Sequence, residues 1–245
     1  MPPNGQSLIR PVGFAYEAGH STGEHQHDEH QLVYASHGLL CVDTAEFRWV
    51  LPPLRAVWVP AGTTHTVTAR ADSQMSTLYV DHDVSVSSLD DVTVISVSPL
   101  LRELILYVLH GSPTGPARRR TDAVIIDQLA VAPTAPLELR QLHDPRLQAI
   151  AEILETNPRD QRTLRQFGHH VGANERTLQR LFRRETGTTF GRWRTQLRLQ
   201  HAIITLGQGH TVTTAAITAG YNEPSAFIAA FRSTFGTTPG RYFTT

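Results

Sequence analysis

The pattern of apolar and polar residues changes character along the 245-residue chain. Up to about residue 97, short β-branched or aromatic runs alternate with Gly, Pro, Asp and Ser, which is typical of an antiparallel sandwich or barrel. The expected strands cover residues 32–35, 39–43, 56–60, 66–69, 77–80 and 92–97. Residues 1–97 are therefore predicted to form a β-rich domain.

From residue 99 the apolar spacing becomes helical. Leu101, Leu104, Ile105 and Val108 lie on one face of a helix, and a second helix is expected over residues 122–131. Such helices either cap the core of the β-domain or pair with a second subunit, and the pattern leaves both open. Residues 98–142 are expected to form a helical dimerisation and linker segment of a homodimer, and two prolines mark residues 132–139 as the linker.

The remaining residues, 143–245, contain a duplication. FRRETGTTFGRW at 182–193 and FRSTFGTTPGRY at 231–242 are identical at seven of twelve positions, 49 residues apart. Each repeated segment begins within the second helix of a pattern that consists of a short helix, a glycine-containing turn and a second helix. This pattern is a helix-turn-helix. The expected helices are 164–170 with 175–185, and 212–219 with 224–235, joined by a long helix over 190–206.

The distribution of charge favours a polyanionic partner for this duplicated half. The formal net charge is zero, but residues 1–142 contain 9 Arg against 15 acidic residues, and residues 143–245 contain 13 Arg against 7. The second helix of each copy has an outward polar face suited to the major groove of double-stranded DNA. Its members are Arg176, Gln179, Arg180, Arg183 and Arg184 in the first copy, and Ser225 and Arg232 in the second.

The two copies differ on that face. Ala229 stands where the first copy has Arg180, so we expect the first copy to read bases and the second to clamp phosphate or contact thymine methyls. The alternative is a helical bundle with solvated arginines, which explains the duplication and the charge less well.

The sequences VGANERTLQRLFRRETGTTFGRWRTQLRLQHA and AGYNEPSAFIAAFRSTFGTTPGRYF closely resemble the tandem helix-turn-helix domain of AraC/XylS-type transcription regulators. The resemblance implies a sequence-specific DNA-binding regulator, with Arg176, Gln179 and Arg180 at base-reading positions. The chain departs from the family pattern at Phe167 and Gly168 in the short first helix, where Ala and Leu are more usual.

The β-rich half contains a histidine pattern. On one strand His25, His27 and Gln31 would share a face, and the pattern H-x-H-x3-Q-x6-G is followed by P-x-G-x2-H ending at His65. Together these look like the two motifs of the cupin barrel, with Gln31 where the family usually has Glu. The resemblance implies one divalent transition metal, zinc, nickel, iron or copper, at His25, His27, Gln31 and His65. The alternatives are a pocket for a small organic effector and histidines that only form hydrogen bonds.

The fold class expected is a two-domain α+β protein, with an N-terminal cupin-like β-barrel and a C-terminal all-α tandem helix-turn-helix domain. We expect a transcription regulator that senses a metal ion or small molecule, with no catalytic residues. The alternatives are a metal-dependent cupin dioxygenase or isomerase with an accessory DNA-binding half, and a module that binds only protein. The single cysteine cannot form an internal disulfide, and the chain has no apolar leader or membrane-length segment, so we expect a soluble cytoplasmic protein with no membrane partner.

Overall fold

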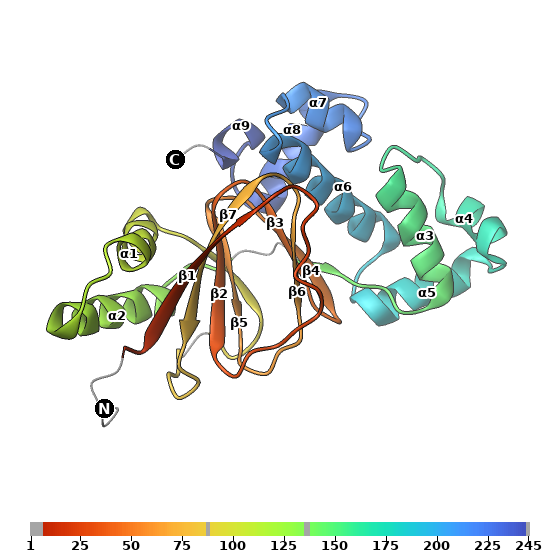
Figure 1. Cartoon of the computed structure of the whole chain (residues 1–245). Helices are drawn as coiled ribbons and strands as arrows, with labels where there is room; N and C mark the ends of the chain where they lie inside the picture. Colours follow the sequence, from red (N-terminus) through yellow and green to blue (C-terminus); the bar gives the residue numbers. More distant parts are fainter. Residues whose placement is uncertain (1–6, 87–88, 135–137, 244–245) are drawn as a thin grey trace. The chain divides into compact units, whose positions relative to one another are not determined.

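The computed structural model divides the chain into two compact units, and it describes residues 7–86, 89–134 and 138–243 (Figure 1). The first unit comprises Met1–Thr44 and Leu51–Leu137, and the second comprises Ala45–Val50 and Glu138–Thr245. The short segment Ala45–Val50 therefore belongs to the second unit, although the chain on both sides of it belongs to the first.

The first unit is built on antiparallel strands. A five-stranded sheet has the order β1-β7-β2-β5-β8, and β3 pairs separately with β6. The bounds are β1 Ile9–Tyr16, β2 His30–His37, β3 Leu40–Asp43, β5 Arg55–Val59, β6 Thr66–Ala69, β7 Ser73–Val80 and β8 Thr93–Ser96.

Two helices cover one face of the five-stranded sheet. Alternation along β2 directs Leu32 and Tyr34 into a core that also contains buried side chains of α1, Pro99–His110, and α2, Gly115–Ala130. Those helical side chains are Leu101, Ile105, Val108, Ile125 and Leu129. The two helices therefore cap the core of the sheet, whereas Gln31 belongs to the opposite face.

The second unit is mainly helical. Its strand pair joins β4, Phe47–Leu51, to β9, Glu138–Arg140, in antiparallel register. Its helices are α3 Pro145–Thr156, α4 Leu164–Val171, α5 Glu175–Thr186, α6 Phe190–Gly207, α7 Val212–Thr218, α8 Pro224–Phe235 and α9 Pro239–Tyr242. None of the described helices is long and apolar enough to cross a membrane.

Capping residues set the starts of these helices. Asp144 accepts a hydrogen bond from the backbone N–H of Arg146 at the start of α3, directly before the first-turn proline. Thr163 and Gln166 form a reciprocal capping box at the start of α4, and Asn174 caps α5 through the backbone N–H of Thr177. The last two caps explain why the helix starts expected at residues 164 and 175 are the observed ones.

The expected division into a β-rich N-terminal part and a helical tandem helix-turn-helix part is confirmed. The expected helix over residues 122–131 was too short, because α2 begins at Gly115, directly before a proline that suits the first turn. Strands β1, β4 and β9 and the short helix α9 were not expected. Residues 135–137 of the expected linker lie outside the described residues, and β9 begins at Glu138.

Candidate DNA-binding surface and candidate histidine site

The first helix-turn-helix comprises α4, a tight turn and α5. Gly172 ends α4 with a positive φ of 65°, a conformation that costs glycine little. Gly168 is buried within α4, and a Cβ there would overlap the carbonyl oxygen of Ala173 in the turn. The departure from the family pattern at Gly168 therefore has a physical reason, since glycine lets the turn pack against the helix.

Helix α5 presents its expected polar face to solvent. Leu178, Leu181 and Phe182 are buried on the inner face. The exposed residues include all five that were expected on the second helix of the first copy, namely Arg176, Gln179, Arg180, Arg183 and Arg184. A shallow groove over α5 is lined by Asn174, Arg176, Thr177, Gln179, Arg180 and Arg183.

Arg184 differs from its neighbours on α5, because it pairs with Glu185 at 3.3 Å. Glu185 also accepts hydrogen bonds from the backbone N–H groups of His143, at 2.8 Å, and Asp144, at 3.2 Å. Arg184 therefore lies at the edge of the exposed face beside α3.

The second helix-turn-helix, α7 and α8, presents a different surface. Phe227 and Phe231 are buried, and the expected Ser225 and Arg232 are exposed. Ile228 is 37% exposed, and it was missed in the sequence. The offset of 49 residues would have found it, because it pairs Ile228 with Gln179. Together with Ala229, this isoleucine gives α8 an apolar outer edge.

The four residues expected at the metal site lie together in the first unit. His25 and His65 pair through their backbones, with N···O distances of 3.0 and 2.8 Å in the two directions. One ring nitrogen from each of His25, His27 and His65 lies within 4.8 Å of the others, so the triad could hold a metal ion. The expectation that His25, His27 and Gln31 lie on one strand was wrong, because β2 begins only at His30. His25 is held in place by its isolated β-bridge to His65.

Hydrogen bonds to carbonyl groups orient two of the three rings. Nδ1 of His25 lies 2.9 Å from the carbonyl oxygen of Gly23, and Nδ1 of His65 lies 2.9 Å from that of Thr63. A carbonyl oxygen only accepts, so each Nδ1 carries the proton and each Nε2 keeps its lone pair. Nε2 of His27 is buried without a hydrogen-bond partner among the described residues. Metal-binding histidines usually donate one ring N–H to a carbonyl or carboxylate oxygen and bind the ion through the other ring nitrogen.

Gln31 adds a fourth polar atom. Its amide nitrogen donates to Oγ1 of Thr77 at 3.1 Å and to the hydroxyl of Tyr79 at 3.3 Å. Thr77 uses its own proton on the carbonyl oxygen of Leu32, so it accepts from Gln31. The amide oxygen of Gln31 is thereby directed at Nε2 of His65, 2.9 Å away. Two acceptors face each other, and a shared cation would satisfy both, because ligands about 2.1 Å from one ion can lie about 3 Å apart.

Burial favours the neutral form of two of the three imidazoles, His65 and His27. It lowers the pKa of His65 to about 4, and the nearby His25 and His27 rings contribute to the lowering. Burial also lowers the pKa of His27, followed by the effect of His25. At neutral pH both rings are neutral, which is the form that binds a metal ion.

The other histidines of this region have different surroundings. Nδ1 of His30 accepts from the backbone N–H of Ala61 at 3.0 Å, and its ring stacks on Trp58. His20 and His37 are exposed, and neither occupies a histidine position of the two motifs.

Comparison with known proteins defines the class. A family model described as an AraC-like ligand binding domain matches residues 12–184, and one described as a helix-turn-helix domain matches residues 168–245. The chain belongs to the AraC family of transcription regulators, with an N-terminal ligand-binding domain and a C-terminal helix-turn-helix domain.

Among individual proteins, the chain is 34% identical to the HTH-type transcriptional regulator NimR of Escherichia coli K12, over 94% of this chain and 86% of NimR. RipA of Corynebacterium glutamicum is 34% identical over 46% of this chain and 33% of RipA. ToxT of Vibrio cholerae, with bound (E)-4-(8-methylnaphthalen-1-yl)but-3-enoic acid, aligns at a TM-score of 0.42 and 10% identity, covering 97% of this chain and 98% of ToxT. NimR and RipA are both transcriptional regulators, and the chain is a transcription regulator rather than the alternative cupin enzyme.

Proposed function

We propose that this chain is a one-component transcription regulator whose histidine site binds one divalent transition metal ion, zinc, nickel, iron or copper. The observation that carries the metal proposal is the contact between the amide oxygen of Gln31 and Nε2 of His65, two acceptors 2.9 Å apart. His25, His27 and His65 would supply imidazole nitrogens, and Gln31 would supply a weak oxygen ligand. The bound ion would add positive charge and hold the four side chains together.

The alternative effector is a small organic molecule with a hydrogen-bond donor that could bridge the same two acceptors. Metal content distinguishes the two. Protein purified without added metal and then incubated with zinc or nickel is expected to retain about one ion per chain after dialysis. The His25→Ala/His27→Ala variant is expected to retain none, whereas the exposed His37→Ala control should match the wild type. Equal metal content in all three proteins would exclude this ligand set.

For DNA, we propose that α5 reads base edges. Arg176, Gln179 and Arg180 are exposed on one face, and Arg and Gln form bidentate contacts with guanine and adenine in the major groove. Arg183 and Arg184 would contact phosphates. The proposal that the chain is a DNA-binding regulator would fail if the protein shifted no DNA duplex from its own promoter region at low salt.

Helix α8 is proposed to contribute differently. Ser225 and Arg232 are suited to phosphate contacts, and the apolar edge of Ile228 and Ala229 is suited to thymine methyl groups. Helix α6, at 18 residues, spans about 27 Å, so the two recognition helices could enter successive major grooves.

Coupling between effector and DNA is proposed as a population shift, in which the effector binds one arrangement of the protein better than another. The segment Ala45–Val50 offers a covalent route. Within the second unit, the carbonyl oxygen of Arg48 accepts from Gln200 of α6 at 3.2 Å, and its guanidinium pairs with Glu155 of α3 at 3.0 Å. The stretch of sequence between His25 and His65 therefore also contains a segment that is bound to helices of the second unit.

We also propose a homodimer that acts in the cytoplasm, where bacterial DNA lies. Leu100 and Tyr107 of α1 and Val124 of α2 are large apolar side chains exposed on the outer faces of these helices. A dimer would cover them.

A further inference from the structure

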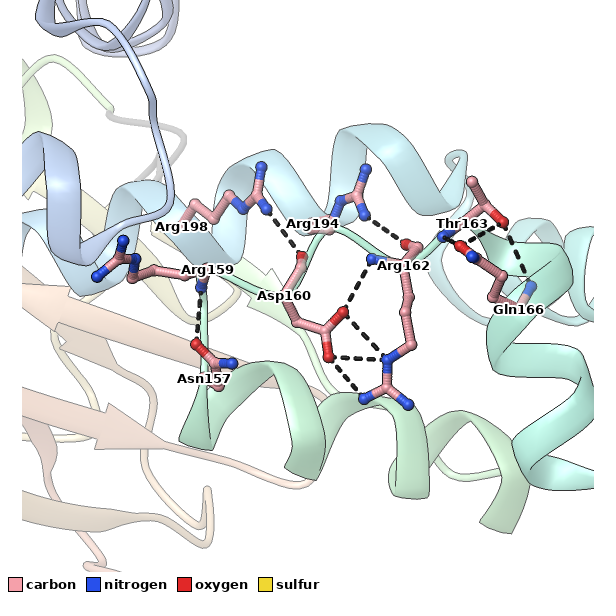
Figure 2. A network of polar contacts seen from close by, with 8 residues as sticks. All are labelled: Asn157, Arg159, Asp160, Arg162, Thr163, Gln166, Arg194 and Arg198. Carbon is pink, nitrogen blue, oxygen red and sulfur yellow. Dashed lines mark hydrogen bonds and ion pairs between the residues drawn. The ribbon is translucent and has the colours of Figure 1, made fainter.

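The loop of residues 157–162, between α3 and α4, is bound to α6 by two arginines one helical turn apart. Arg198 donates from Nε to the carbonyl oxygen of Pro158 at 2.9 Å and from a terminal nitrogen to that of Asp160 at 3.0 Å. Arg194 donates to the carbonyl oxygen of Arg162 at 2.9 Å (Figure 2). The carbonyl groups of every second residue from Pro158 to Arg162 therefore face the same helix.

The loop is also held internally. The carboxylate of Asp160 accepts from the backbone N–H of Arg162 at 2.8 Å and from its guanidinium at 2.6 Å. Asn157 accepts from the backbone N–H of Arg159 at 3.2 Å (Figure 2). These bonds keep the carbonyl groups of the loop in the orientation that α6 requires.

The same loop contacts the second helix-turn-helix. The side-chain amide of Gln161 donates to the carbonyl oxygen of Gly220, in the turn between α7 and α8, at 3.1 Å. Gly220 is buried with a φ of 82°, and a Cβ there would lie 2.6 Å from the carbonyl oxygen of Pro158. The turn of the second helix-turn-helix thus packs directly against a loop that leads into the first.

Arg194 and Arg198 differ from the arginines of α5. Burial lowers the pKa of both, and their guanidinium groups are directed at backbone carbonyl oxygens. Arginines that neutralise phosphates need to be exposed, as those of α5 are. These two positive charges therefore serve the internal structure of the domain.

We propose that the 157–162 loop is a brace that fixes the distance between the two recognition helices, with Arg198, Gln161 and Gly220 as positioning residues. The spacing between the two elements of a DNA site is a geometric consequence of how far apart the recognition helices are held. The brace therefore selects the spacing at which both elements are bound. This inference rests on the proposed engagement of one DNA by both α5 and α8.

Selection from a library of randomised duplex DNA tests the brace. The wild type is expected to enrich a two-part motif with one fixed spacing. Arg198→Ala is expected to keep the first part of the motif and to accept spacings that differ by at least one base pair, or to lose about tenfold of the enrichment of the second part. Gln161→Ala, which leaves α6 intact, should shift the spacing in the same sense. The control Arg159→Ala removes an equal charge from the exposed side chain of the same loop and should keep the wild-type motif and spacing.

The inference is overturned if Gln161→Ala and Arg198→Ala both enrich the wild-type motif at the wild-type spacing while melting cooperatively. If Arg198→Ala does not fold, the Gln161→Ala result decides. A one-part motif from the wild type would also overturn it, although α5 would still read DNA. No enriched motif from the wild type would instead remove the proposed DNA reading, and the brace with it.

Discussion

His65 illustrates how much one buried side chain can determine at this site. It is 1% exposed, its Nδ1 proton goes to the carbonyl oxygen of Thr63, and its Nε2 faces the amide oxygen of Gln31. Burial holds its pKa at about 4, so neither charge nor a second proton resolves that contact at neutral pH. The proposed cation, shared with Gln31, would satisfy both acceptors.

The lowered pKa of His65 predicts a pH dependence of stability in the metal-free protein. Above the ordinary pKa of 6.5 both folded and unfolded chains hold the ring neutral, so this group has no effect. As the pH falls from about 6.5 to 4, only the unfolded chain binds the proton, and the free energy of unfolding falls by up to about 3 kcal/mol. Urea unfolding of chelator-treated protein at pH 7 and pH 5 measures the change.

The His65→Gln variant should show a smaller loss of stability between those pH values than the wild type. The control His37→Ala should show the same loss as the wild type, because His37 is exposed. An equal pH dependence in all three proteins would contradict the assignment to His65.

Gly168 gives a second prediction at this scale, with the sign opposite to helix propensity. Replacing an interior helical glycine by alanine ordinarily stabilises a helix by about 1 kcal/mol. At Gly168 the added Cβ would overlap the carbonyl oxygen of Ala173, so Gly168→Ala is expected to destabilise the protein by about 1–3 kcal/mol. The control Gly191→Ala, in α6 with open space around it, should be neutral or slightly stabilising in thermal melts. A stabilised Gly168→Ala variant would show that the turn can move away.

At the scale of elements, α5 and α8 are corresponding helices of the two helix-turn-helix copies, and their exposed surfaces differ. The inner faces match, with Phe182 and Phe231 buried 49 residues apart. The outer faces differ, because Arg180 corresponds to Ala229 and Gln179 to Ile228. This difference supports the proposal that α5 forms hydrogen bonds to bases and that α8 makes apolar contacts.

Arg180→Ala is predicted to weaken binding to a selected site by about 1–3 kcal/mol and to relax specificity at one position, as expected for a base-reading side chain. Arg232→Ala should weaken binding more uniformly across sequences and reduce the salt dependence. Fluorescence anisotropy with single-base variants of the site measures both. Unchanged affinity and specificity of Arg180→Ala would remove its role.

Local sequence signals were sufficient for most elements and insufficient for those made by distant pairing. The helices of the second unit begin at capping residues such as Thr163 and Asn174, which can be read directly. Strand β1 contains Pro11 and Gly13 and becomes a strand by pairing with β7, some 60 residues away. The bridge between His25 and His65 is likewise a long-range pairing. The grouping of the three histidines could be predicted from the motifs, whereas their hydrogen bonds and the contact with Gln31 could not.

At the scale of the whole molecule, the ligand-binding domain and the helix-turn-helix domain are not simply consecutive in the sequence. Ala45–Val50 belongs to the second unit, between two stretches of the first. Its strand β4 pairs with β9, and Arg48 contacts α3 and α6. The proposed population shift would use the backbone on either side of this segment as its covalent link.

The central claim is that metal at the histidine site controls DNA binding, and the most direct test is the dissociation constant for a selected DNA site with and without metal. Anisotropy titrations are made with chelator-treated protein and with protein incubated with nickel or zinc, for the wild type and for His25→Ala/His27→Ala. The account predicts a change of about 5-fold to 150-fold in the wild type, the usual range of such coupling, and no change in the variant. The same dissociation constant for the wild type with and without metal, or an equal change in the variant, would contradict it.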